Sequence, residues 1–190
     1  MIRAIIFDCF GVLYAPTSTV YFAKFPELHD ELYDLNKMSD HGFVGKREYL
    51  ETVARLTGVS EEETLQEFAK EYAVNQPVID YIRNELKPRY KIALLSNIGH
   101  EWISGFFNEH QLHDLFDEVV MSSQEGITKP NPLIYERTAE RLSVQPDECV
   151  MIDDRQENCD GAVKAGMRAF CFSEGATPAS IRSFIEDADA

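Results

Sequence analysis

The stretch CVMIDDRQENCDGAVKAGMRAFCF, residues 149–172, decides the predicted fold because it contains a strand, a helix and a second strand. The apolar runs 149–152 and 169–172 are continuous rather than alternating, which is typical of strands covered on both faces. Residues 157–165 have a helical pattern that ends at Gly166, a residue type favoured just after a helix. This order predicts a βαβ unit with parallel strands.

The same alternation of strands and helices extends toward the N-terminus. Further continuous apolar runs predict strands at residues 4–7, 91–95 and 118–121. Helices are expected at 77–87 and at 131–142, the second with Asn131 as its cap and a proline at its first position. We therefore predict an α/β fold built on a doubly wound parallel sheet.

The segment from residue 16 to residue 76 breaks this alternation, because it lacks a convincing strand. Its pattern predicts helices at about 27–38, 46–57 and 61–72. Ser60 and Glu63 form a capping-box pattern at the start of the last helix. The loop after a strand of an α/β sheet lies at the carboxyl edge, where ligands bind, so this helical insertion should overhang the site. The predicted domains are a core of residues 1–15 and 77–190 and a helical cap of residues 16–76.

The charge of the chain limits its partners, since 33 acidic and 18 basic residues give a net charge of −15. Nucleic acids and anionic membranes need a basic face, so we expect neither as a partner. A small phosphorylated ligand is compatible with this charge, because a site can supply its own local positive charge. The apolar N-terminal run is too short for a signal peptide, and no run reaches membrane-spanning length. We expect a soluble cytoplasmic protein, as a monomer or a small homo-oligomer.

Polar residues capable of chemistry follow the predicted strands. They are Asp8 after the first strand, Ser96 and Asn97 after the second, Lys129 before the helix at 131–142, and Asp153 and Asp154 after the fourth strand. Because the carboxyl ends of parallel strands meet at one edge of a sheet, these side chains should converge in one crevice. Each residue alone is more often a turn former, a helix cap or an ordinary loop residue. Their order and their shared place at strand ends favour a functional site.

The three carboxylates and the lysine have complementary chemistry. Asp8, Asp153 and Asp154 cannot all stay ionised at close range without a cation, and dense oxygen ligands suit Mg²⁺. Ser96 offers a hydroxyl and a backbone N–H to an anionic oxygen, and Lys129 offers a positive charge. Asp8 is then free to attack phosphorus as a nucleophile and to form an aspartyl-phosphate.

Four segments, taken in order, resemble the haloacid dehalogenase-like hydrolase superfamily over essentially the whole chain. They are FDCFGVL (7–13), LLSN (94–97), ITKPNPLIY (127–135) and MIDDRQENCDGAVKAGM (151–167). The insertion after the first strand resembles the subgroup with a small helical cap. The pattern is most similar to sugar phosphatases of the glucose-1-phosphate type, whose cap has a glycine-containing turn before an acidic helix, comparable to residues 42–48.

The resemblance implies a Rossmann-like core and Mg²⁺-dependent hydrolysis of a small phosphomonoester, such as a sugar phosphate. It implies Asp8 as the nucleophile, and Mg²⁺ held by Asp8, the backbone carbonyl of Phe10, Asp154 directly and Asp153 directly or through water. It implies phosphate binding by Cys9, Phe10, Ser96, Asn97 and Lys129. Asn158 matches a position that supports the acidic loop.

Position 10 departs from the family pattern. Most phosphatases of the family have a second Asp there, which protonates the leaving oxygen and then activates water, but this chain has Phe10. Such a group contributes about 10²–10⁴-fold to the rate. Three interpretations stay open: a substrate with a good leaving group such as an anomeric sugar phosphate, a proton donor elsewhere (His100, Tyr14 or a cap side chain), or a protein that binds phosphate and turns over poorly. Relatives of the glucose-1-phosphate type also tend to lack this Asp, so activity is favoured.

Two other classes are weaker alternatives. An aromatic residue at position 10 resembles the 2-haloacid dehalogenases, in which Asp8 would attack carbon without a metal. The acid pair of the fourth strand would then repel itself, and Arg47 and Arg55 of the cap do not match the halide-binding position. A non-enzymatic phosphoacceptor, like a receiver domain, uses similar residues in the reverse order along the chain.

The remaining aromatic and histidine residues suggest no ligand site. Trp102, Ile103, Phe106 and Phe107 are predicted to form the apolar face of a helix after Ser96, and so to belong to the core. His29, His110 and His113 lack the spacing of metal ligands and are expected at the surface or at helix ends.

Overall fold

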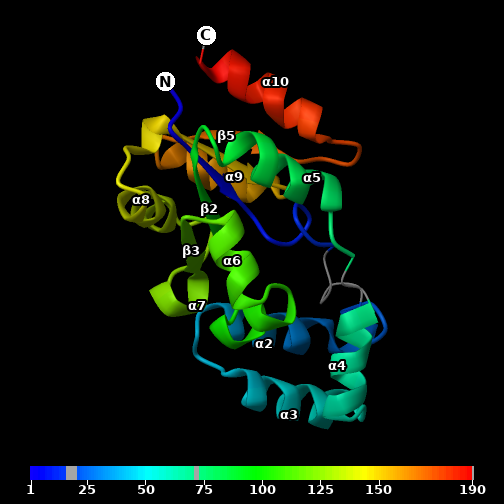
Figure 1. The fold of residues 1–190 in the computed structure, drawn as a ribbon. Coiled ribbons are helices and arrows are strands. Elements are labelled where there is room, and N and C mark those ends of the chain that lie inside the picture. Colours follow the sequence, from blue (N-terminus) through cyan, green and yellow to red (C-terminus); the bar gives the residue numbers. More distant parts are fainter. Residues whose placement is uncertain (16–20, 71–72, 190) are drawn as a thin grey trace.

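The computed structural model describes residues 1–15, 21–70 and 73–189 of the chain (Figure 1). Its strands are β1 (Ala4–Phe7), β2 (Lys91–Ser96), β3 (Glu118–Met121), β4 (Cys149–Asp153) and β5 (Arg168–Cys171). They form one parallel sheet in the order β3-β2-β1-β4-β5. Every predicted apolar run is a strand to within about one residue, so the predicted α/β fold with a parallel sheet is confirmed.

Helices cover both faces of this sheet. On one face lie α5 (Gln76–Tyr81), its π-helical continuation (Ile82–Leu86) and α10 (Pro178–Asp189), and on the other lie α8 (Pro132–Arg141) and α9 (Gln156–Lys164). The connections include a 3-10 helix (His100–Gly105), α6 (Glu109–Leu115), α7 (Ser122–Glu125) and a 3-10 turn (Pro146–Glu148). Asn131 caps α8 as predicted, because its side chain accepts a hydrogen bond from Leu133 N–H at 3.1 Å. None of the helices in the described ranges combines the length and the apolar character that a bilayer span requires.

The strand residues alternate between two apolar clusters, which explains why the runs are continuous in sequence. In β1, Ile5 and Phe7 join the cluster beneath α5 and α10, whereas Ala4 and Ile6 join the cluster beneath α8 and α9. All four side chains are fully buried. Burial of each large side chain contributes about 1.5–3 kcal/mol. The packing on both faces therefore fixes the ends of the strands, and with them the residues that follow.

The helices between β1 and α5 form a lobe with an apolar core of its own, called the helical lobe below. They are α2 (His29–Asp40), α3 (Lys46–Thr57) and α4 (Glu61–Lys70), with a 3-10 turn (Pro26–Leu28) before them. Leu32, Val53 and Phe68 are buried between these helices. The predicted capping box is present, since Glu63 N–H donates to Ser60 Oγ and Ser60 N–H donates to Glu63 Oε2, both at 3.3 Å. The predicted extension of the last helix to residue 72 lies outside the described residues.

The helical lobe packs on the core beyond the carboxyl ends of the strands (Figure 1). Ser122 Oγ of α7 donates a hydrogen bond to the carbonyl oxygen of Asp40, the last residue of α2, at 2.5 Å. Gly42 follows with a φ of +79°, and a Cβ at this position would lie 2.4 Å from the carbonyl oxygen of Ser123. The backbones of lobe and core therefore approach each other at a distance that glycine permits and other residues do not.

Trp102 packs, partly buried, against the core cluster as predicted, and it also belongs to the contact between the helical lobe and the core. Its ring packs edge-on against Tyr49 of α3, with 5.3 Å between ring centroids. The ring centroid of Phe68 of α4 lies 6.0 Å away. The segment is a 3-10 helix rather than an α-helix. With three residues per turn, Ile103 and Phe106 align with each other and Trp102 lies off their line. Ile103 and Phe106 do lie in the core, as predicted.

Candidate active site

The predicted site residues meet at the carboxyl edge of the sheet, where β1 and β4 are neighbours. The chain runs from β1 to β2 and β3 on one side of the sheet, and then places β4 and β5 on the other side. Such a switch point leaves a crevice in which open α/β sheets bind ligands. Asp8 directly follows β1, Asp153 ends β4, and Asp8 N–H donates to Ile152 O at 2.9 Å. The pairing of these two strands therefore brings the two aspartates together.

Three carboxylates form a cluster in this crevice. One oxygen each of Asp8, Asp153 and Asp154 lies within 4.8 Å of the others. Asp8 and Asp153 are buried, and Asp154 is the least buried of the three. Gly11 makes the cluster possible, because its φ is +80° and a Cβ there would lie 2.1 Å from Asp154 Oδ2. The structure therefore brings together the acids that the sequence predicted as metal ligands.

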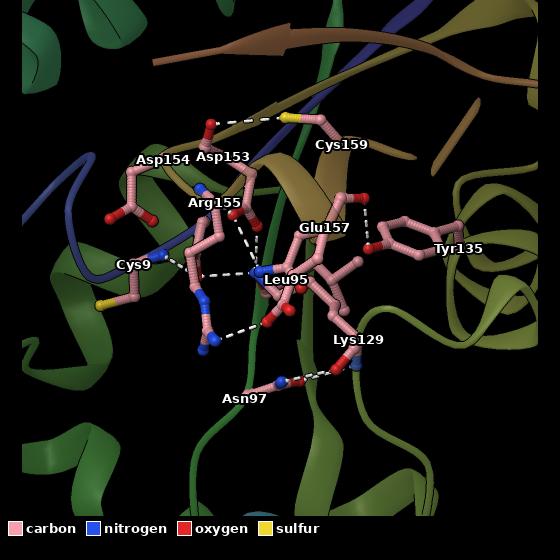
Figure 2. Close-up of polar contacts among 12 residues, drawn as sticks. Cys9, Leu95, Asn97, Lys129, Tyr135, Asp153, Asp154, Arg155, Glu157 and Cys159 are labelled. Carbon is pink, nitrogen blue, oxygen red and sulfur yellow. Dashed lines mark hydrogen bonds and ion pairs between the residues drawn. The ribbon is translucent and has the colours of Figure 1, made fainter. Parts of the chain in front are cut away.

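Lys129 supplies positive charge to this cluster (Figure 2). Its Nζ lies 2.8 Å from Asp8 Oδ1 and 2.6 Å from Asp153 Oδ2, and it also donates a hydrogen bond to Leu95 O at 3.0 Å. Lys129 is only 4% exposed. Burial alone would lower the pKa of Lys129, but the charges of Asp153 and Asp8 outweigh burial and raise this pKa. The lysine therefore stays charged, opposite two buried acids.

Asp153 is held as a fixed anion. Its Oδ1 accepts hydrogen bonds from Asn158 Nδ2 at 2.8 Å and from Arg155 N–H at 3.0 Å, while Oδ2 pairs with Lys129. Burial opposes this charge, but the charge and hydrogen bond of Lys129, aided by the other two donors, lower the pKa of Asp153. Asn158 thus supports the acidic loop in the place where the family resemblance predicted it.

Asp8 differs from Asp153 because only one of its two carboxylate oxygens, Oδ1, is hydrogen-bonded within the described ranges. Its Oδ1 accepts a hydrogen bond from Cys9 N–H at 2.6 Å and pairs with Lys129. No hydrogen bond within the described ranges involves Oδ2. Burial raises the pKa of Asp8, Lys129 opposes this rise and Asp153 adds to it. Burial also raises the pKa of the Cys9 thiol well above its usual value, so this neighbour stays neutral and contributes its backbone N–H.

Ser96 and Asn97 follow β2 at the same edge but play different parts. In the part of the chain that the structure describes, Ser96 Oγ is the one buried side-chain oxygen or nitrogen without a hydrogen-bond partner. Such an atom is costly to bury, so a ligand oxygen is its natural partner. The Asn97 side chain, predicted to bind phosphate, instead donates to Lys129 O at 2.9 Å and accepts from Lys129 N–H at 2.8 Å. Asn97 therefore positions Lys129.

The replacement donors considered for the missing acid at position 10 differ in how far the structure engages them. The Phe10 ring packs edge-on against Phe106, with 4.9 Å between ring centroids. Tyr14 donates its hydroxyl hydrogen to Phe106 O at 2.6 Å, and burial raises the pKa of this hydroxyl. His100 is exposed at the start of a 3-10 helix, where its backbone N–H donates to Ser123 Oγ at 2.8 Å. The Tyr14 hydroxyl is therefore already engaged, while His100 and a side chain of the helical lobe stay open as proton donors.

Asp40 is absent from the residues predicted above, yet it interacts with the charges of the crevice. It ends α2 in the helical lobe and is half-buried. Burial raises the pKa of Asp40 to about 7, while the charges of Lys129 and Arg155 act against this rise. The sequence offers one faint signal for it, an acid two residues before the glycine of the turn at residue 42.

The donor set of the crevice fits a hard divalent cation. Its side-chain donors are carboxylate oxygens, the ligands that Mg²⁺ prefers, and backbone carbonyls such as that of Phe10 are of the same kind. Three ionised carboxylates and one lysine leave two negative charges, which one divalent cation neutralises. The residues present are therefore suited to Mg²⁺.

Comparison with known proteins gives the same family that the motifs indicated. A family model of haloacid dehalogenase-like hydrolases matches residues 2–166 of the chain. The curated protein named "Putative phosphatase YhcW", from Bacillus subtilis (strain 168), is 30% identical over 183 residues, covering 88% of this chain and 82% of that protein.

Two solved structures share the fold. A predicted HAD-like family hydrolase from Porphyromonas gingivalis has a TM-score of 0.79 and 26% identity, covering 97% of this chain and 98% of that one. A HAD family enzyme from Bacteroides thetaiotaomicron, in complex with magnesium and inorganic phosphate, has a TM-score of 0.75 and 21% identity, covering 90% of this chain and 93% of that one. The match of the family model over most of the length, on a site of this composition, shows that the chain belongs to the haloacid dehalogenase-like hydrolases.

Proposed function

We propose that the chain is a Mg²⁺-dependent phosphatase that hydrolyses a small phosphomonoester through an aspartyl-phosphate at Asp8. The observation that carries this proposal is the half-open carboxylate of Asp8, held by Lys129 beside a second buried aspartate. The relative named as a phosphatase supports the reaction class. The magnesium and phosphate bound to the structural neighbour support the cofactor.

The chain's own residues suffice for most of the reaction. Asp8 Oδ2 attacks phosphorus, and the ester P–O bond breaks with its electron pair on the leaving oxygen, which takes up a proton. Ser96 Oγ donates to a phosphoryl oxygen, and the positive charge of Lys129 stabilises the negative charge of the phosphoryl group in the transition state. Water then gives up a proton and attacks phosphorus, the bond between Asp8 and phosphorus breaks, and the carboxylate of Asp8 is restored. The proton released by water balances the one taken up by the leaving oxygen.

Mg²⁺ would be held by Asp8, the Phe10 carbonyl, Asp153 and Asp154. When bound, it supplies positive charge that lets the anionic phosphate approach these carboxylates. Asp153, whose charge is fixed by three donors, gives this site a permanent anion. Lys129 remains necessary beside the metal, because it keeps Asp8 Oδ1 oriented.

The helical lobe acts as the cap of this site in our proposal, with residues 16–76 as the cap and the rest as the core. Its end at Asp40 and Gly42 lies against α7 at the carboxyl edge of the sheet, so its side chains select the substrate. The resemblance to glucose-1-phosphate-type enzymes makes a sugar phosphate the preferred substrate class. An anomeric leaving group is more acidic than an ordinary alcohol, and this suits a site with Phe10 at the acid position.

The dehalogenase alternative gains no support from the arginines of the helical lobe. Arg47 pairs with Glu51 on the surface of α3, with 2.8 Å between Nε and Oε1. Arg55 is exposed near the end of the same helix. Asp154 beside Asp153 also adds a carboxylate that attack on carbon does not need.

The decisive experiment is a panel of phosphate esters assayed with Mg²⁺ and with EDTA, using wild type and Asp8→Asn. We expect turnover that needs Mg²⁺ and that falls to background in Asp8→Asn, because the nucleophile is lost. Asp187→Asn, an exposed acid on α10, is the matched control and should retain full activity. Absence of turnover on the whole panel would refute the proposal. Chloride release from 2-chloropropionate in EDTA would favour the dehalogenase. A phosphoenzyme that is stable would favour a phosphoacceptor.

A further inference from the structure

The proposed phosphatase lacks a proton donor on the loop after β1. Phe10 has no acidic hydrogen, and the Tyr14 hydroxyl is already engaged with a backbone carbonyl. A leaving alkoxide or phenoxide of low acidity needs a proton as the P–O bond breaks. If the proposed function is correct, another residue must supply that proton.

The end of α2 is fixed against the rim of the crevice by several contacts. Ser122 Oγ donates to the Asp40 carbonyl at 2.5 Å, and His41 Nε2 lies 3.4 Å from Thr128 Oγ1. Thr128 is the residue before Lys129 in the chain. The glycine at position 42 lets this turn sit directly on α7. The end of α2 and the turn after it therefore lie against α7 and, through His41, beside the residue that precedes the site lysine.

The side chain of Asp40 is held from one side only. Asn36 Nδ2 donates to Asp40 Oδ2 at 3.3 Å, and the Tyr49 hydroxyl in turn donates to Asn36 Oδ1 at 3.3 Å. No hydrogen bond within the described ranges involves Asp40 Oδ1. This chain of donors begins in the core of the helical lobe and ends at the carboxyl group, so it orients Asp40 and leaves one oxygen for a ligand.

The charged groups around Asp40 come from both lobe and core. Lys129 and Arg155 from the core act on it electrostatically, and His41 is its neighbour in the chain. From the lobe, Tyr49 of α3 is a neutral neighbour, and the charge of Asp40 helps to raise the pKa of its hydroxyl. Burial raises the pKa of Asp40 to about 7, against the effect of the two cations. A general acid is most effective when its pKa lies near the working pH. Asp40 is therefore available in both protonation states near neutrality.

We propose that Asp40 of the helical lobe is the general acid–base residue of this enzyme, in place of the acid missing at position 10. Its carboxyl group gives its proton to the leaving oxygen as Asp8 bonds to phosphorus and the ester P–O bond breaks. The Asp40 carboxylate then takes a proton from the water that attacks the aspartyl-phosphate, and Asp8 departs as a carboxylate. One proton leaves Asp40 and one returns in each cycle. The cap thus contributes to the chemistry as well as to substrate choice.

The test compares two aryl esters of nearly the same shape in Asp40→Asn and wild type, with Mg²⁺ present. Phenyl phosphate releases phenolate, which needs a proton, whereas p-nitrophenyl phosphate releases an anion stabilised by its nitro group. In the first turnover we expect Asp40→Asn to slow phenyl phosphate by about 10²-fold or more and p-nitrophenyl phosphate far less. Asp40→Glu should restore part of the rate on phenyl phosphate. The fall of this rate as the pH rises past the Asp40 pKa should be present in wild type and absent in Asp40→Asn.

Asp34→Asn is the matched control, because Asp34 is an exposed acid on the same helix. Circular dichroism and thermal unfolding establish that each variant is folded. Equal first-turnover losses on both esters, or a raised KM with an unchanged kcat, would assign Asp40 to substrate binding and overturn the proposal. Full activity of Asp40→Asn beside an active wild type would also overturn it and leave the phosphatase intact. A wild type inactive on both esters would refute the phosphatase itself.

Discussion

The catalytic edge of the sheet and the helical lobe bury opposite kinds of side chain. At the edge, Lys129 and the acids Asp8 and Asp153 lie buried in direct contact with one another. In the helical lobe the interior is apolar, and an acid such as Glu67 pairs with lysines near the surface. Buried ion pairs contribute little to stability beyond what apolar side chains would give. The contrast therefore indicates that the charges at the edge serve chemistry, while the apolar core of the lobe serves folding.

Lys129→Met tests the buried charge of the edge and should have the largest effect on stability. The change leaves Asp8 and Asp153 as buried acids without their partner, so we expect unfolding in EDTA to need about 3–5 kcal/mol less free energy. Urea unfolding at neutral pH measures this loss. Added Mg²⁺ should recover part of it, because the ion binds the folded state.

Lys164→Met, at an exposed position on α9, is the control for that variant and should change stability by about 0.5 kcal/mol or less. If Lys129→Met unfolds at the same urea concentration as wild type, the buried pairs do not stabilise the edge. Asp8 and Asp153 would then not depend on Lys129 as their buried counter-charge.

Gly42→Ala tests the junction between the two regions and should have an intermediate effect. The added Cβ would strike the Ser123 carbonyl at 2.4 Å, so the lobe must shift away from α7. We expect a loss of about 1–3 kcal/mol and a clear fall in phosphatase activity, because Asp40 lies beside this turn. Gly58→Ala is a matched control, since Gly58 has a φ of +73° but a Cβ added there would meet no atom within 4 Å. Equal activity losses in both variants would show that docking at position 42 is unimportant.

Glu67→Gln tests the surface charge of the helical lobe and should have the smallest effect. Hydrogen bonds from Lys24 and Lys70 lower the pKa of Glu67 from 4.5 to about 2. A carboxyl with a lowered pKa stabilises the fold above its unfolded pKa, and this contribution is lost as the pH falls through its folded pKa. Wild type should therefore melt slightly above Glu67→Gln near pH 6, and the difference should shrink steadily as the pH falls toward 2. Glu62→Gln, which replaces an exposed acid of the same helix, is the matched control.

Several features were predictable because they depend on local pattern and on sheet topology. The continuous runs of the five strands reflect burial on both faces, and Asn131 and Ser60 cap their helices through side chains close by in sequence. Asp8, Asp153 and Lys129 converge because residues at the ends of parallel strands share one edge. These features need no knowledge of how distant segments dock.

Other features depend on contacts between distant segments. The Asn97 side chain binds the backbone of Lys129 rather than facing a ligand, and nothing near Asn97 in sequence indicates this partner. Trp102 contacts Tyr49 of the helical lobe in addition to the core, and its segment forms a 3-10 helix rather than the expected α-helix. Neither residue has a periodic pattern that would reveal its partner.

The sequence by itself determined the alternation of strands and helices needed for a parallel sheet, the family, and the acids and lysine of the site, because each rests on a short motif or on a strand end. Only the tertiary structure decided that Asp40 lies close enough to Lys129 and Arg155 for their charges to act on its carboxyl group. These residues are far apart in the chain, and they meet through the close packing of Gly42 on Ser123 and the bond from Ser122 to Asp40. Such a contact depends on how the surfaces of the lobe and the core fit together. The spacing of residues along the sequence does not indicate that fit.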